Sequence, residues 1–161
     1  MHHRPFQQVD VFTATAYRGN PLAVVLDGTG LSTEEMQQFT RWTNLSEATF
    51  VLPPTPEGRA AGADYRVRIF YPAGELPFAG HPTLGTCHAW LKAGGQPQVA
   101  GRIVQECGVG LVNIRQQGDL LAFAAPPLRR SGPLDEADVA LIARGLGVAR
   151  EDIVQHAWCD N

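Results

Sequence analysis

Apolar and polar residues alternate along several short stretches of the chain, a pattern that predicts strands with one buried face. Phe6 to Phe12 (F-Q-Q-V-D-V-F) has this period of two, and Leu22 to Leu26 is a continuous apolar run rich in β-branched residues. Further strands are expected at 48–52, 65–70, 102–106, 110–115, 120–124 and 153–159. The proline- and glycine-rich segments 53–58 and 72–80 predict an exposed loop and a long irregular connection.

Two segments predict amphipathic helices. Ser32, with Glu35 three residues later, forms a capping box ahead of the first helix, which is expected to end at 44–46. The second covers 135–146 and stops at Gly147. Its inward-facing positions are expected to be Val139, Ile142 and Leu146.

A third helix is expected to be different in character. Pro82 suits the first turn of a helix, residues 83–91 carry no formal charge, and Gly94-Gly95 closes the segment. A short helix that is apolar nearly all round must be enclosed on most of its sides. Strands therefore outnumber helices and do not alternate with them, so an α+β fold is predicted over a doubly wound α/β sheet.

Composition and charge narrow the class of protein. The 161 residues are 44% hydrophobic and carry a formal net charge of -3, so no basic field attracts nucleic acid or anionic lipid. No apolar run approaches the roughly 20 residues that span a bilayer. The three cysteines are odd in number and form no C-x-x-C pair, which disfavours a disulfide framework or a zinc site. A soluble, cytoplasmic protein is expected.

Glu47 is the first candidate for chemistry. It lies where a helix is expected to give way to a strand, between the apolar residues Leu45 and Ala48. In a closed cleft, desolvation would raise the pKa of this carboxyl and suit it to proton transfer near neutral pH. A solvated turn residue is the commoner fate of a glutamate, and the residues alone leave both interpretations open.

His81 is the second candidate, within the segment G-H-P. Gly80 permits close approach of a ligand to the backbone, and the amides at the start of the following helix can bind a carboxylate. His81 could donate to a substrate or shuttle a proton, or it could simply cap the helix. His88 is nearly two turns further on, too far for a metal shared with His81. Cys87, inside the apolar helix, is expected to be a core residue.

Five motifs in one order carry a resemblance to a known family. They are V-D-V-F-T (9–13), G-N-P-L-A-V-V (19–25), N-L-S-E-A-T-F (44–50), R-I-F-Y-P (68–72) and E-L-P-F-A-G-H-P-T-L-G (75–85). Together they resemble the PhzF-like proteins of phenazine biosynthesis up to about residue 125.

The resemblance implies an architecture similar to that of diaminopimelate epimerase. Two matching lobes, each a strand barrel curled around a central helix, hold the active site between them. Residues 1–125 would form the first lobe, and 126–161 a connecting helix and the first strand of an incomplete second lobe. Family members are nearly twice as long, and their second half supplies an aspartate and further substrate contacts. The chain is therefore expected to need that half, from the same gene or as a separate chain.

The resemblance also implies a function. Glu47 would be the acid/base of an isomerase that moves a proton on a small cyclic or amino-acid-like carboxylate, with His81 as its catalytic partner. Asn20, Ser46 and Gly80 would bind the substrate, and neither a metal nor an organic cofactor is expected. Ala79 stands where epimerases of this fold have a cysteine, which disfavours two-cysteine racemisation. A homodimer or other homo-oligomer is expected. The alternative is a non-catalytic binding or interaction domain on the same fold.

Overall fold

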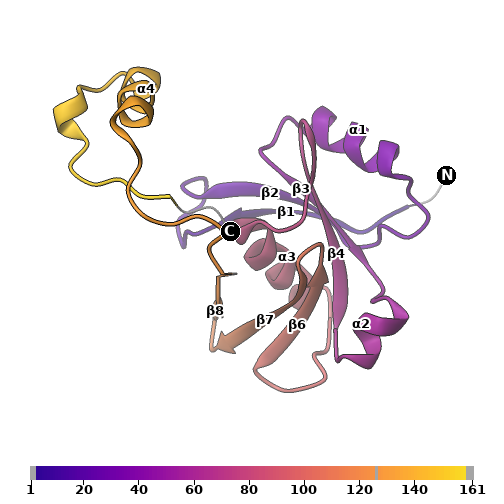
Figure 1. The fold of residues 1–161 in the computed structure, drawn as a ribbon. Coiled ribbons are helices and arrows are strands. Elements are labelled where there is room, and N and C mark those ends of the chain that lie inside the picture. The colour runs from indigo at the N-terminus through magenta and orange to yellow at the C-terminus, as the bar shows by residue number, and fades with distance from the viewer. Residues whose placement is uncertain (1–2, 126, 159–161) are drawn as a thin grey trace. The chain divides into compact units, whose positions relative to one another are not determined.

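The computed structural model describes residues 3–125 and 127–158 (Figure 1). The chain divides into two compact units, Met1–Ala124 and Ala125–Asn161. The first unit contains an eight-stranded sheet and the helices α1 (Thr33–Thr43), α2 (Pro56–Ala60) and α3 (Gly80–Lys92).

The strands of the sheet follow the order β1-β2-β3-β4-β6-β7-β8, with β5 paired to β4 beside this path. Neighbours are antiparallel except for β2 with β3 and β4 with β6, which are parallel. The strands are β1 (Phe6–Val11), β2 (Asn20–Val25), β3 (Ala48–Leu52), β4 (Tyr65–Tyr71), β5 (Gly74–Leu76), β6 (Arg102–Cys107), β7 (Gly110–Gln117) and β8 (Leu120–Phe123).

Helix α3 is the centre of this unit. It contacts β1, β2, β3, β6 and β8, and because β1 and β8 are the two ends of the strand order, the sheet must curl around the helix (Figure 1). Helix α1 packs instead against β3 and β4. The predicted α+β fold, with strands curled around a central helix, is confirmed.

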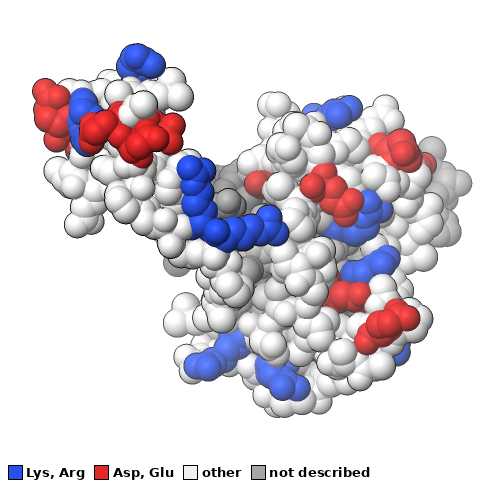
Figure 2. Space-filling model, in the orientation of Figure 1, with Lys and Arg blue, Asp and Glu red and all other residues white. Residues whose placement is uncertain are grey.

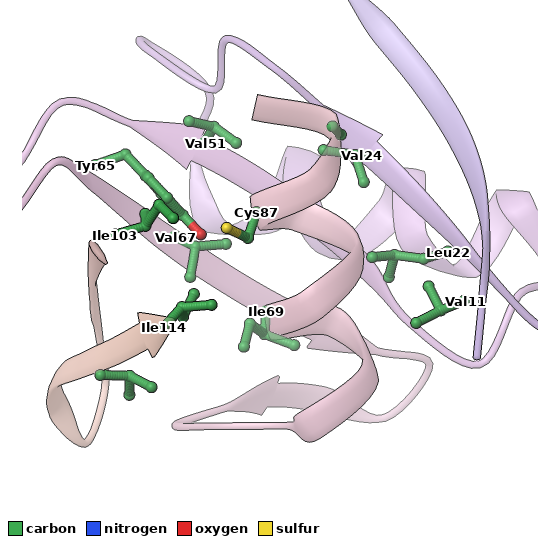
Figure 3. Close-up of a cluster of buried hydrophobic side chains, with 12 residues drawn as sticks. Val11, Leu22, Val24, Val51, Tyr65, Val67, Ile69, Cys87, Ile103 and Ile114 are labelled. Atoms are coloured by element: carbon green, nitrogen blue, oxygen red, sulfur yellow. The ribbon is translucent and has the colours of Figure 1, made fainter. Parts of the chain in front are cut away.

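The core consists of apolar side chains from the strands that converge on α3. Figure 3 shows them on both sides of the helix. Cys87 of α3 is fully buried among them, and burial raises the pKa of its thiol to about 12, so it is the core residue that was predicted. The strand residues around it include Val11, Leu22, Val24, Tyr65, Val67, Ile69, Ile103 and Ile114.

The closest approach of α3 to the sheet is at Gly85. A Cβ atom at this position would lie 2.7 Å from Leu22 Cδ2 and 2.8 Å from Val11 Cγ2. Both distances are shorter than ordinary van der Waals contact, so a side chain at this position would require the buried Leu22 and Val11 to shift. The helix axis is thereby held against the strands that carry the candidate site.

Buried hydroxyl and amide groups also tie α3 to the strands. Tyr65 Oη donates to Gln105 Oε1 at 3.0 Å, and Gln105 Nε2 donates to Thr83 Oγ1 of α3 at 3.0 Å. Further along the helix, Thr86 Oγ1 donates to Thr49 Oγ1 of β3 at 2.8 Å. All five side chains are at most 1% exposed, so these bonds replace the water that burial removes.

The predicted capping box of the first helix is confirmed. Ser32 Oγ accepts from the Glu35 backbone N–H, and Glu35 Oε2 accepts from the Ser32 backbone N–H at 2.7 Å. The helix ends at Asn44, which is left-handed at φ 56°. Glu47 follows three residues later, so this stop decides where the chain turns towards β3.

Two short elements were missed in the segments predicted to be irregular. Residues 53–58 are not all loop, because Thr55 caps helix α2 and Pro56 occupies its first turn, a pairing that favours helix starts. Residues 72–80 include β5, which forms a hairpin with the end of β4. Helix α3 also begins at Gly80, two residues before Pro82.

The second unit contains α4 (Glu136–Leu146) and a short 3-10 helix, η1 (Arg150–Asp152). The predicted helix is confirmed, with Asp135 as its cap and Gly147 left-handed at φ 69°. The predicted inward face is only partly right: Val139 is buried, but Ile142 is 42% exposed and Leu146 68% exposed.

The strand predicted at 153–159 is wrong for 153–158, and residue 159 lies outside the described residues. The backbone here bonds to a nearby loop in place of a strand: Trp158 N–H donates to Gly132 O at 2.9 Å. In the same loop, Leu134 N–H donates to His156 Nδ1 at 3.1 Å. Apolar composition alone could not distinguish this arrangement from a strand.

Charged side chains are interspersed on the surface of the first unit. On the face shown in Figure 2, Lys and Arg alternate with Asp and Glu and form no extended field of one sign. Within the described residues, no helix has both the length and the apolar character required to cross a bilayer.

Gly85→Ala is expected to destabilise the protein by about 1–3 kcal/mol, because the added methyl overpacks a closed core. Gly145→Ala in α4 is the matched control, since a Cβ there meets nothing within 4 Å. That variant should be neutral or stabilising by up to about 1 kcal/mol, because alanine favours helix over glycine. Urea unfolding of both variants measures the difference, and equal stabilities would contradict the close approach.

Candidate functional site

Glu47 and His81 lie together where β3 and α3 begin. Glu47 precedes the first residue of β3, His81 is the second residue of α3, and Glu47 Oε2 is 3.5 Å from His81 Nε2. The side chains are 18% and 9% exposed. The structure thus brings the two predicted catalytic residues into contact although 33 residues separate them along the chain. Their roles stay predictions.

The two facing atoms, Glu47 Oε2 and His81 Nε2, are buried and have no hydrogen-bond partner among the described residues. Burial lowers the pKa of His81 below its ordinary value of 6.5, and the Glu47 carboxylate and a hydrogen bond to the Pro21 backbone oppose this without overcoming it. The imidazole is therefore mostly neutral at pH 7.

The tautomer of His81 follows from these contacts. The Pro21 backbone has no N–H and can only accept, so a nitrogen of His81 donates to it. Since Nε2 has no partner, the donor is Nδ1, which leaves Nε2 of the neutral ring as an acceptor facing the carboxyl of Glu47. A single proton between Nε2 and Oε2 would satisfy both atoms.

Asn20 and Ser46 lie beside this pair. Asn20 is the first residue of β2, and Ser46 Oγ donates to its Oδ1 at 3.3 Å. Ser46 adjoins Glu47, and Asn20 adjoins Pro21, whose backbone bonds His81. Parallel pairing of β2 with β3 places the starts of both strands at the same edge of the sheet, next to the start of α3.

Gly80 is the first residue of α3, and no side chain caps this helix start. Ala79, at the cap position, makes no side-chain hydrogen bond, and no acidic residue lies in the first turn. The first intrahelical bond is Thr83 N–H to Ala79 O, and Pro82 has no N–H. The amides of Gly80 and His81 therefore have no partner within the helix and suit a carboxylate.

Two aromatic residues that sequence reasoning missed border this corner. The ring of Phe12, just after β1, lies 6.4 Å from the ring of His81 between centroids. A Cβ atom at Gly80 would lie 3.4 Å from Phe123 Cζ at the end of β8. The sequence pattern indicated Phe12 only as the end of a strand. The period of two that predicts a strand gives no information on a residue that follows the strand.

Other titratable candidates lie apart from the pair. Glu75 accepts two hydrogen bonds from Arg68 on the neighbouring β4 and is 39% exposed. His88 is exposed on α3. Within residues 3–125 and 127–158, no three His, Cys, Asp or Glu side chains lie close enough to hold a metal ion.

Comparison with known proteins gives a consistent picture. Residues 9–158 match the PhzC-PhzF family, described as phenazine biosynthesis-like protein. The chain is 49% identical over 119 residues to antisense-enhancing sequence 1 of Schizosaccharomyces pombe, covering 74% of this chain and 39% of that protein. It is 44% identical over 117 residues to trans-2,3-dihydro-3-hydroxyanthranilate isomerase of Pseudomonas aeruginosa, covering 71% of this chain and 39% of the isomerase.

A solved structure, a predicted epimerase from Pseudomonas aeruginosa, superimposes with a TM-score of 0.73 at 28% identity. The match covers 96% of this chain and 54% of that one. The chain therefore spans between two fifths and just over half of the length of the proteins it matches.

The pKa of His81, followed by NMR titration, is expected below 6.5 and lower still in Glu47→Gln. The reason is that the carboxylate of Glu47 opposes the effect of burial, so its removal leaves burial unopposed. Glu75→Gln, which alters a carboxylate bound to Arg68, should leave the value unchanged. A His81 pKa at or above 6.5, or one indifferent to Glu47→Gln, would contradict the described pair.

Proposed function

Because the chain belongs to the PhzC-PhzF family of phenazine biosynthesis-like proteins, we propose that the complete protein is an isomerase that moves a proton on a small cyclic carboxylate. Glu47 is the acid/base, and His81 shares its proton. Asn20, Ser46 and Gly80 contact the substrate. The similarity to trans-2,3-dihydro-3-hydroxyanthranilate isomerase over most of this chain supports a substrate of that class.

The observation that carries the proposal is the buried pair beside an uncapped helix start. Glu47 Oε2 and His81 Nε2 lie 3.5 Å apart and have no hydrogen-bond partner among the described residues, and the amides of Gly80 and His81, which have no partner within the helix, begin α3. A structural ion pair would be expected to satisfy its remaining hydrogen-bonding atoms, because leaving them unpaired costs stability. Clustering of unsatisfied groups at one edge is typical of a site that completes its bonds with a ligand.

The proposed chemistry is the transfer of one proton between two carbons of the substrate. Ionised Glu47 removes a proton from a carbon of the substrate, and the double bond shifts as negative charge passes towards the substrate carboxylate. The amides at the start of α3 hold that carboxylate and stabilise the added charge. The protonated Glu47 then returns the proton to a different carbon, so the reaction involves no net oxidation. Neutral His81 can take up the proton in between and keep it from water.

The second half of the family's length is proposed to complete this site. The residues named here lie at one open edge of a half-barrel, and they supply one face of a binding site. The opposing face, with further substrate contacts, would come from the remaining part of the same polypeptide or from a second chain. Assembly of the complete protein into a homo-oligomer stays a prediction.

Substitution Glu47→Gln in the complete protein should lower turnover by at least about a hundredfold, the usual scale for a general acid/base. The amide keeps the volume of the side chain, so the fold should survive. NMR in D2O, with trans-2,3-dihydro-3-hydroxyanthranilate as substrate, follows both product and deuterium incorporation. The control Glu75→Gln alters a carboxylate in the neighbouring motif and should retain turnover within about twofold.

Near wild-type turnover by Glu47→Gln would remove this residue from the mechanism. Substrate binding without turnover by the wild-type protein would instead favour the alternative, a non-catalytic binding domain on the same fold. We include that alternative in the test because the name of the Schizosaccharomyces pombe relative describes no isomerase.

Activity of the complete protein is also expected to survive dialysis against EDTA and gel filtration without added cofactor. Proton transfer by a carboxyl–imidazole pair, assisted by helix amides, requires no Lewis acid or electron carrier. The measurement is the turnover rate before and after treatment, with residual metal determined by mass spectrometry. Loss of activity that one particular metal restores would count decisively against cofactor-independent catalysis.

A further inference from the structure

Phe12 combines two features that folded proteins usually avoid. Its backbone is left-handed at φ 68°, a region that suits glycine and in which a bulky side chain is strained. Its side chain is also 70% exposed, so a large apolar ring remains in water. Neither feature stabilises the fold, and the ring is nevertheless held against His81.

The backbone around Phe12 is held in this conformation by its neighbours. Asp10 Oδ2 accepts from Arg18 N–H at 3.2 Å, and Asp10 Oδ1 accepts from Gly19 N–H at 3.0 Å. A Cβ atom at Gly19 would lie 2.1 Å from Val11 O, so the two arms of the β1–β2 loop lie in close backbone contact. The loop is thus closed at its base, and Phe12 lies directly beyond that closure.

The position of the ring relates it to the proposed substrate site. Phe12 borders His81, and Phe123 borders Gly80, so aromatic rings adjoin both residues at the start of α3. Phe123 is itself held edge-to-face by Phe78, with 5.4 Å between the ring centroids. A ligand whose carboxylate binds the amides of Gly80 and His81, which have no partner within the helix, would therefore have aromatic rings next to it.

We propose that Phe12 is a specificity-determining residue, whose ring stacks on the flat face of a conjugated cyclic carboxylate bound at Glu47 and His81. This inference rests on the proposed function. A planar ring lies against an aromatic side chain over its whole face, whereas a puckered saturated ring touches it at a few hydrogens. Phe12 therefore selects for planar over saturated ring acids, and its left-handed backbone at φ 68° directs the ring to where that contact is made.

The expected size of the effect is set by aromatic pairing. Such pairs contribute enough beyond their buried area to change a dissociation constant by about two- to tenfold. The complete protein should bind 3-hydroxyanthranilate, a planar ring acid, more tightly than cis-2-aminocyclohexanecarboxylate, a saturated ring acid with an amino group at the adjacent carbon. The ratio of the two dissociation constants is the measured quantity.

Asparagine is the informative substitution, because it tolerates the left-handed region and removes the ring. Tyr17→Asn is a matched control: Tyr17 belongs to the same loop, is left-handed at φ 66° and is 97% exposed. Phe12→Asn and Tyr17→Asn should both keep or raise the melting temperature, since each relieves the same kind of strain. Phe12→Tyr keeps an aromatic ring and should keep the preference for the planar acid.

Isothermal titration calorimetry of the complete protein with both acids tests the proposal. Phe12→Asn should reduce the planar-to-saturated preference by about fivefold, while Phe12→Tyr and Tyr17→Asn leave it within about twofold. An unchanged preference in Phe12→Asn, or no preference in the wild type, overturns the proposal. So does an equal loss of affinity for both acids, which would make Phe12 a general wall of the site.

This binding test is independent of turnover. If Glu47→Gln retains activity but Phe12→Asn loses the planar preference, the proposed mechanism fails and the ring-selecting role of Phe12 stands. If Glu47→Gln is inactive and Phe12→Asn keeps the planar preference, the proposed mechanism stands and the ring-selecting role of Phe12 fails.

Discussion

The enclosure of α3 by the curled sheet is the constraint on which the rest of the first unit depends. A helix with so few charged positions is stable in water only when strands surround it, and the sheet has a core only because the helix fills it. Gly85 sets how closely the two approach, since any side chain there would meet Leu22 and Val11. The start of α3 is therefore fixed relative to β1 and β2.

The candidate site lies at the edge where these elements begin. Parallel pairing puts the starts of β2 and β3 at the same edge of the sheet, with Ala48 opposite Ala23, and the buried helix brings His81 to that edge. The two side chains are largely buried there, with 18% of Glu47 and 9% of His81 exposed. Burial lowers the pKa of His81 at this edge.

Sequence reasoning predicted the elements with strong local signals. The capping box at Ser32 and the stop at Gly147 each depend on a few adjacent residues, so the pattern was sufficient. Helix α2 and strand β5 are short and held by neighbours, so the proline content of their segments wrongly predicted irregular structure. The segment after Asp152 bonds to a loop, so its apolar content wrongly predicted a strand. Ile142 and Leu146 have the spacing of a buried face, but spacing does not say whether anything covers it.

The candidate site could be predicted only in part from the sequence. The residue types alone indicated Glu47 and His81 only weakly as site residues, and the order of the family motifs made this assignment specific. Their contact is a product of strand order, which no local pattern encodes. Phe12 could not be found in this way, because its unusual backbone angle depends on bonds to Asp10 and on the close approach at Gly19.

The buried hydrogen bonds along α3 have a consequence for the orientation of His81. Apolar contacts alone would hold a smooth helix in place but would resist its rotation about its own axis only weakly. Successive residues of a helix point about 100° apart, so a slip by one residue would turn the imidazole away from Glu47. The bonds of Thr83 to Gln105 and of Thr86 to Thr49 are directional, and a rotated helix would bury them unpaired. These two hydrogen bonds therefore oppose rotation of α3 and keep His81 facing the carboxylate of Glu47.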